Sequence, residues 1–175
     1  RKENSFLQVS IADSRSDGYR ENSEYNRSNI LLHGRLTAGI HSLSLLAGYT
    51  DLLAYIPSSV DLNSYRNTPQ KAAANWLAMR GHRQYDKWQG GLSLKSEITK
   101  NLSNTLVLYG MSTDAYETRP FNILDELTNT IGMRAKLVLQ KGRTSVMAGL
   151  EYFDEQYKWK IFEIVDGKEG QLQSS

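Results

Sequence analysis

The chain has 175 residues, a formal net charge of +2 and no cysteine, and 39% of its residues are hydrophobic. Its length is that of one ordinary domain, and 21 basic against 19 acidic residues lack the positive excess of a dedicated nucleic-acid binder. Without cysteine there is no disulfide, thiolate nucleophile or cysteine-based zinc site. No apolar run approaches the ~20 residues of a membrane-spanning helix, whereas a β-barrel, whose strands alternate apolar and polar residues, fits this composition.

Alternation of apolar and polar residues predicts seven strands. The clearest is 130–140, where the apolar side chains from Ile131 to Leu139 share one face and Arg134 and Lys136 lie on the other. A helix would scatter these charges around its circumference. The seven predicted strands, in chain order, are 4–12, 24–36, 42–55, 85–98, 104–117, 130–140 and 144–153.

The connections between these strands alternate between short and long. The short ones are 37–41, 99–103 and 140–143, and the long ones are 13–23, 56–84, 118–126 and a tail from about Tyr157. In an antiparallel meander, alternate connections lie at the same end of the sheet. Short turns at one end and long loops at the other are typical of transmembrane β-barrels. Within the longest loop, the Ala-rich segment 70–79 after Pro69 predicts a short helix.

Alternation does not decide which face meets water. Charged residues in mid-strand suit a polar lumen, and Tyr49, Trp88 and Tyr152 on the apolar faces near strand ends suit an interfacial girdle. With the loop asymmetry, these features favour an all-β, antiparallel transmembrane β-barrel segment, and a soluble ligand-binding barrel is the alternative. An eighth strand at 158–165 would instead complete a small outer-membrane barrel with an adhesin or porin role.

Neither end of the sequence has the features of a complete exported protein. The chain begins Arg-Lys-Glu-Asn with no apolar segment behind it, so no signal peptide is recognisable. No residue run alternates after Val165, and the last residues are polar. We therefore expect residues 1–175 to be part of one β-barrel domain in a longer chain.

Four segments resemble the barrel of TonB-dependent outer-membrane receptors. They are SDGYRENSEYNRSN at 16–29, YIPSSVD at 55–61, NTPQKAAANW at 67–76 and RPFNIL at 119–124. In order and spacing they are similar to the iron-complex or siderophore receptors of the Bacteroidota type. The resemblance covers roughly residues 5–160.

The resemblance implies a 22-stranded barrel in the bacterial outer membrane, plugged by an N-terminal domain. Such receptors bind a scarce extracellular ligand, here a small metal chelate such as an iron–siderophore complex, and import it with energy relayed by TonB. The implied partners are outer-membrane lipid, the TonB complex acting through the plug, and the small ligand, and none is a nucleic acid. This sequence contains no plug domain, TonB box or C-terminal closing strand, so it locates no residue of energy coupling.

Cationic and aromatic residues in the long loops are the candidate ligand-binding residues. Cationic and aromatic groups suit anionic, aromatic iron chelates through charge pairing and stacking. The alternative is structural: the helix packs the loop over the barrel rim, and an Arg pairs with a neighbouring carboxylate. The candidates are Tyr65, Arg66, Trp76, Arg80, Arg83, Arg119 and Phe121.

The sequence predicts no catalytic residue, no metal site and no cofactor. His33, His41 and His82 have no partners at metal-ligand spacing and are expected in the lumen, a turn and the long loop. The run DSRSDG at 13–18 lacks the further ligands of a calcium loop and is predicted to be a turn. Asp125 and Glu126 are expected in a loop, exposed to solvent. The predicted activity is binding.

Overall fold

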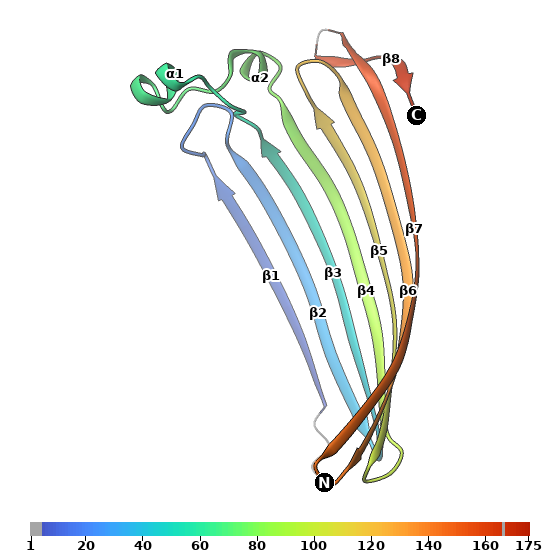
Figure 1. Ribbon diagram of the computed structural model, residues 1–175. Coiled ribbons are helices and arrows are strands. Elements are labelled where there is room, and N and C mark those ends of the chain that lie inside the picture. Colours follow the sequence, from blue (N-terminus) through green and yellow to red (C-terminus); the bar gives the residue numbers. More distant parts are fainter. Residues whose placement is uncertain (1–4, 166) are drawn as a thin grey trace.

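The computed structural model describes residues 5–165 and 167–175, and its strands form one antiparallel sheet in chain order. Figure 1 shows long, curved strands side by side, with two short helices at one end of the sheet. The elements are β1 (Phe6–Ser16), β2 (Tyr25–Ala38), β3 (His41–Tyr55), α1 (Leu62–Asn67), α2 (Ala74–Ala78), β4 (His82–Glu97), β5 (Leu102–Thr118), β6 (Ile123–Lys141), β7 (Thr144–Val165) and β8 (Lys168–Ser174).

The all-β, antiparallel prediction is confirmed, but the described sheet has eight strands where seven were predicted. β7 runs for 22 residues and includes the first part of the predicted tail, with the proposed eighth strand at 158–165. The eighth strand is β8, where no alternation was recognised. It is short and pairs with β7 through two register shifts, which disturb the period of two. The predicted start at Asn4 lies outside the described residues.

The connection between β5 and β6 is also shorter than predicted. β5 ends at Thr118 and β6 begins at Ile123, so the loop expected over 118–126 is a tight turn. Ile123 and Leu124 are among the few buried hydrophobic residues described, and their burial favours continuing the strand to the sheet's end. Asp125 and Glu126 therefore lie in β6, and the prediction that they are loop residues was wrong.

An uninterrupted register from β1 to β7 divides the sheet into two faces. Paired residues share a face and neighbours along a strand alternate, so one face collects the large apolar side chains. We call it the apolar face, and the other the polar face. The apolar face includes Val9, Ile11, Ile30, Leu43, Leu45, Trp88, Leu92, Leu94, Leu106, Leu108, Ile131, Met133, Leu137, Leu139, Val146, Leu150 and Tyr152.

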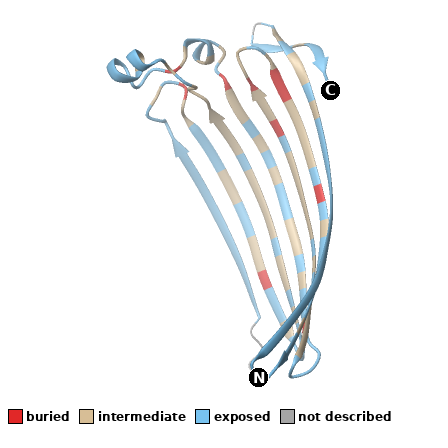
Figure 2. Ribbon diagram, viewed as in Figure 1, coloured by how far each residue is buried: buried red, intermediate tan, exposed pale blue. Residues whose placement is uncertain are grey.

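The apolar face is uncovered. Leu137, Leu139, Val146 and Leu150 are 44%, 48%, 58% and 59% exposed, while Arg134 and Lys136 lie on the opposite face. In Figure 2 the few buried positions lie mostly toward the helix end of the sheet. A water-soluble domain seldom leaves so large a contiguous apolar surface exposed, so this face requires an apolar environment.

Between β4 and β7 the loop-end edge of the apolar band runs obliquely to the strands. On β4 this edge lies at Trp88, whose cross-strand row continues through β5 and β6 to Gln156 on β7, yet the band on β7 stops at Tyr152. From β1 to β4 the edge follows one row, and at the turn end Val146, Leu139 and Leu102 also share one row. The loop-end edge therefore shifts by four residues between β4 and β7.

The size of this shift gives the inclination of the strands to the band. Four residues along a strand span about 13 Å, and the three strand spacings from β4 to β7 span about 14 Å. From β4 to β7 the strands are therefore tilted by about 40° from the perpendicular to this edge. Strands of transmembrane barrels are tilted by about 35–45° from the barrel axis.

At the helix end, side chains of the β1–β2 loop donate hydrogen bonds to backbone carbonyls of the β3–β4 loop and so hold the two loops together. The Arg20 guanidinium donates to the carbonyl of Lys71 at 2.7 and 3.0 Å and to the carbonyl of Ser58 at 2.7 Å. The side-chain amide of Asn22, which is only 3% exposed, donates to the carbonyls of Ile56 and Gly81 at 2.9 Å. These bonds fix the loop of residues 56–81 as an ordered cap over one end of the sheet.

The helix predicted at 70–79 is realised only in part, as α2. α1 was not predicted, and its signal is Asp61, whose carboxylate accepts the backbone N–H of Ser64 at 2.9 Å as an N-cap. No helix in the described part of the chain is both long enough and apolar enough to cross a membrane.

Gly132 illustrates why some positions on the polar face of the sheet are glycine. Tyr109 lies flat over it, and a Cβ at this position would lie 2.3 Å from the Tyr109 ring, whose hydroxyl bonds Glu151 at 3.1 Å. We expect Gly132→Ala to displace this ring and cost about 1 kcal/mol, through a lost hydrogen bond and repacking. Urea unfolding of the detergent-folded full-length protein measures it. Gly90→Ala, whose Cβ meets only the Leu46 carbonyl oxygen at 3.5 Å, is the control and should be neutral.

Candidate functional site

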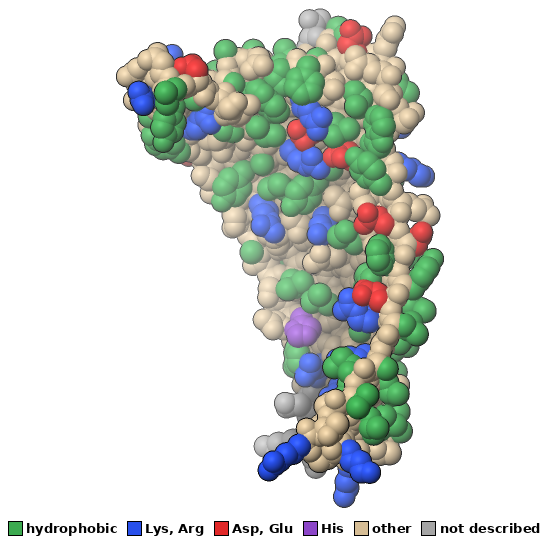
Figure 3. All heavy atoms as spheres, in the orientation of Figure 1, with side chains coloured by type: hydrophobic (Ala, Val, Ile, Leu, Met, Phe, Trp, Pro, Cys, Tyr) green, Lys and Arg blue, Asp and Glu red, His purple; other side chains and the backbone are tan. Residues whose placement is uncertain are grey.

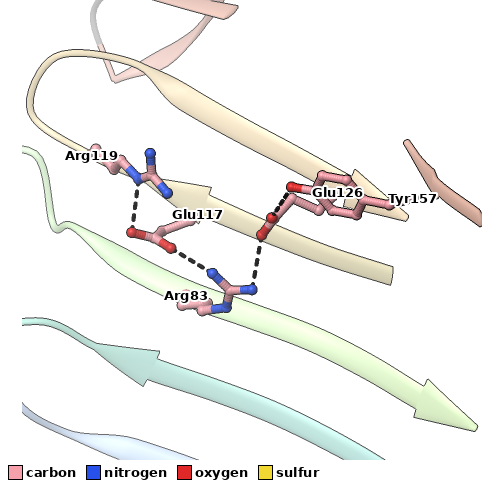
Figure 4. A network of polar contacts seen from close by, with 5 residues as sticks. All are labelled: Arg83, Glu117, Arg119, Glu126 and Tyr157. Atoms are coloured by element: carbon pink, nitrogen blue, oxygen red, sulfur yellow. Dashed lines mark hydrogen bonds and ion pairs between the residues drawn. The ribbon is translucent and has the colours of Figure 1, made fainter. Parts of the chain in front are cut away.

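The polar face carries a charged network near the loop end, which we call the Arg83 network (Figure 4). Arg83 on β4 donates to Glu117 on β5 at 2.7 Å and to Glu126 on β6 at 2.9 Å. Arg119, in the β5–β6 turn, donates to the other oxygen of Glu117 at 2.8 Å. The Tyr157 hydroxyl of β7 donates to Glu126 at 2.5 Å. Four consecutive strands are thus joined by side chains.

The sheet register builds this network. Arg83 and Glu117 are directly paired across β4 and β5, and Glu126 follows two residues after Leu124, the cross-strand partner of Glu117. The two carboxylate side chains are only 14% and 16% exposed, and that of Arg83 is 40% exposed. Two guanidinium groups therefore match two carboxylates of the same sheet. The structural alternative for Arg119 was pairing with a nearby carboxylate, and the structure shows this pair with Glu117.

A second predicted residue, Arg80, closes the base of the long loop. It has φ of 50°, ion-pairs with Glu24 of the first loop, and places its guanidinium 4.1 Å from the centroid of the Tyr55 ring. The Trp76 ring lies directly over Gly81, where a Cβ would be 2.3 Å from the ring. Arg80 and Trp76 thus fasten the loop to the strand ends, in agreement with the structural alternative for these residues.

The Arg80–Glu24 pair predicts a response to acid. Burial favours the neutral acid, but hydrogen bonds from its own backbone and the Arg80 guanidinium outweigh it and hold the pKa of Glu24 below 4.5. A depressed pKa stabilises the loop above the ordinary value, and this stabilisation is lost as pH falls through the folded pKa. We expect Trp fluorescence to change below about pH 4.5. In Glu24→Gln the same change should already be present at pH 7.

The remaining predicted residues do not join either cluster. Tyr65 and Arg66 project from α1, and Tyr65 is 66% exposed. Phe121, 65% exposed, lies in the β5–β6 turn on the other side of the loop end from α1 (Figure 1). The structure therefore brings Arg83 together with Arg119, and Trp76 with the Arg80 segment. Among the described residues the other three side chains have no polar partner, and they lie at the loop end of the sheet.

Sequence reasoning missed the acidic half of the network and a hollow further along the polar face. The hollow has a volume of about 630 Å³ and is lined by His33, Gln89, Tyr109, Met111 and Arg134, among others. Arg134 at its border ion-pairs with Glu151 at 2.6 Å. The face of each residue was readable from alternation, but which strands place these residues opposite one another required the register.

The histidines occupy structural positions. His33 lies on the polar face with its ring 5.0 Å from that of Phe6, and His41 at the start of β3 has Nδ1 2.8 Å from the Ser96 hydroxyl. His82 was expected in the loop but is the first residue of β4. Among the described residues, no group of three or more His, Cys, Asp or Glu could hold a metal ion.

The segment examined as a calcium loop is largely strand. β1 continues to Ser16, and within it Arg15 pairs with Asp13 at 2.9 Å. Only Asp17 and Gly18 begin the turn that was predicted, because the pairing of β1 with β2 extends beyond Ala12 to Ser16.

The fold is that of a segment of an antiparallel β-barrel wall, with an exposed apolar face and a mixed polar face. It is similar to a crystal structure of the ferric citrate transporter FecA in its unliganded form, with a TM-score of 0.78 and 14% sequence identity. The similarity covers 95% of this chain and 26% of the FecA chain, so the chain spans about a quarter of that transporter. No protein-family model and no curated protein sequence matches the chain.

Proposed function

We propose that this chain forms part of the wall of a TonB-dependent barrel in a bacterial outer membrane, which captures and imports a scarce small ligand, foremost an iron chelate. The observation that carries the proposal is the exposed apolar band on the face opposite the charged network, with strands β4–β7 tilted by about 40° from the perpendicular to its loop-end edge. The fold similarity to the ferric citrate transporter agrees with it.

Energetics favour lipid as the neighbour of the apolar face. Moving one large apolar side chain out of water stabilises by about 1.5–3 kcal/mol, and the band contains many that are 40–77% exposed, such as Ile11 and Met133. A soluble barrel would enclose these residues, but the hollow of the described sheet lies on the polar face and the apolar residues lie on the opposite face. In lipid, the polar face becomes the lumen wall.

The sheet edges favour a larger barrel over a complete eight-stranded one. Within the described residues β1 pairs only with β2, and β8 pairs only with β7, so the sheet does not close on itself. Open edges do not persist in a bilayer because their backbone groups lack hydrogen-bond partners. We infer that further strands of the same protein complete a barrel of about 22 strands. The plug and the TonB contact then belong to the rest of that protein.

In this mechanism the ordered loops form the outer mouth and the polar face guides the ligand. The long loops at the helix end first capture the chelate, with Tyr65, Arg66 and Phe121 exposed at the rim. The chelate then passes along the lumen wall beside the plug. Affinity arises from a few anchors in a partly desolvated site, and no covalent chemistry is required.

The test uses the full-length protein in an iron-starved bacterial host. Cell fractions are probed for the protein, and uptake of ⁵⁵Fe-labelled ferric citrate and of a neutral ferric trihydroxamate is measured with and without TonB. We expect the protein in the outer membrane and TonB-dependent uptake of at least one chelate. Recovery in the soluble fraction, or uptake of neither probe, would contradict the proposal.

A further inference from the structure

Several cations on the polar face already have carboxylate partners. Arg83 and Arg119 are held in the Arg83 network, and Arg134 is paired with Glu151. In Figure 3, which shows this face, Lys and Arg side chains occur from the loop end to the turn end, and several near the loop end lie beside Asp or Glu. A cation that is already paired contributes less to anion binding than one that is free.

Lys87 lies on the polar face of β4, four residues closer to the turn end than Arg83, and within the described residues no hydrogen bond or ion pair engages its ammonium group. Arg27, Arg35 and Lys136 on the same face also lack a carboxylate partner in the described chain, but they are exposed, whereas Lys87 is half-buried. An ammonium group that loses part of its hydration gains from an anionic partner.

Hydroxyl groups extend from Lys87 across the neighbouring strands. Lys87 pairs with Thr113 on β5, and Thr113 pairs with Thr128 on β6, so all three side chains share the polar face. In the described part of the chain both threonine hydroxyls are without a hydrogen-bond partner. Adjacent positions are about 5 Å apart, so the three groups offer donors over roughly 10 Å.

The row borders the hollow described above. Gln89 and Met111, which line the hollow, are two residues beyond Lys87 and Thr113 on the same strands and on the same face. A ligand whose bulk occupies the hollow can therefore place an oxyanion against the row. The hollow has a volume of about 630 Å³, within the range of small-molecule sites.

We propose that Lys87, with the hydroxyls of Thr113 and Thr128, is an oxyanion-binding station of the lumen wall and receives carboxylate groups of an anionic metal chelate. The inference rests on the proposed function and adds the class of ligand and its contact residues. It moves the main anion contact from Arg83 and Arg119, whose charges are matched within the sheet, to the unpaired Lys87.

The experiment measures equilibrium binding of ferric citrate to the full-length protein in detergent micelles. Lys87→Met is compared with wild type, with Lys87→Arg, and with Lys136→Met, a control lysine on the same face near the turn end. The neutral ferric trihydroxamate is the second probe. Loss of a charge-assisted hydrogen bond predicts that Lys87→Met weakens ferric citrate binding about tenfold or more. Lys87→Arg should restore most of it, and Lys136→Met should bind as wild type.

The outcomes separate this inference from the proposed function. If wild type binds ferric citrate and Lys87→Met binds it equally well, the oxyanion station is refuted while the transporter proposal stands. If Lys87→Met weakens both probes equally, or lowers the melting temperature without ligand, the partner of Lys87 is another segment of the same protein and the inference is overturned. If wild type binds neither probe, the iron-chelate function fails and the inference fails with it.

Discussion

Replacing Leu108 by arginine should prevent stable insertion of the protein into lipid. Leu108 lies in the middle of the apolar band on β5, paired with Leu92 and Met133, and is 50% exposed. An arginine facing lipid near the bilayer centre of a barrel costs about 2–4 kcal/mol, which is a large part of the stability of an ordinary fold. We expect Leu108→Arg to lose most of its folded, heat-modifiable form when the full-length protein is refolded into lipid vesicles under a urea gradient.

Val107→Arg provides a closely matched control. Val107 is the preceding residue of the same strand, points to the polar face, and pairs with Ser93 and Arg134. The same substitution there adds a charge to the polar face beside the Arg134–Glu151 pair, and we expect it to shift the unfolding midpoint only slightly. If Val107→Arg were the damaging change and Leu108→Arg were tolerated, the apolar face would be in contact with water and the lipid assignment would be wrong.

The second large effect is expected at the Arg83 network. Arg83→Met removes the guanidinium group that Glu117 and Glu126 share. Both carboxylate side chains are less than one-fifth exposed. Removing one partner from a fully buried ion pair costs about 3–5 kcal/mol, and the partial exposure of Arg83 reduces this by solvent screening. We expect a loss of about 1–2 kcal/mol in the free energy of unfolding, measured by urea titration.

A double-mutant cycle with Glu126→Gln tests whether the effect arises from pairing. If the Arg83 network acts as a unit, the double variant should be more stable than the sum of the two single changes predicts. Arg15→Met is the control, because its pair with Asp13 is 72% and 48% exposed and should contribute little. Additive effects in the cycle would show that Arg83 acts through packing alone.

How far the sequence could be read depended on how regularly each strand alternates. For β6 and β7 it placed Leu137, Leu150 and Arg134 on the faces that the structure confirms, because one apolar and one polar face leave a clear period of two. In β5 both sets of alternate residues contain apolar side chains, Leu106 and Leu108 in one set and Val107, Tyr109 and Met111 in the other. Only the register against β4 places Leu106 and Leu108 on the apolar face. β8 was missed because its pairing is irregular.

The candidate site was harder to read than the fold. Arg83 and Arg119 were selected for their charge, but Glu117, Glu126 and Tyr157, which hold them, lie up to several tens of residues away in the chain. No local pattern connects such residues. The same limit applied to Lys87, whose neighbouring hydroxyls become visible only when three strands are aligned.

The amino-acid sequence by itself determined seven of the strands, the faces of the regularly alternating ones and the short turns at one end, because alternation and turn residues are local properties of the backbone and its side chains. Only the tertiary structure decided which arginines are already paired, that Lys87 is free in the described chain, and that the loop-end edge of the apolar band runs obliquely to the strands between β4 and β7. These properties depend on the register between strands, and that register is fixed by contacts over long separations in the sequence.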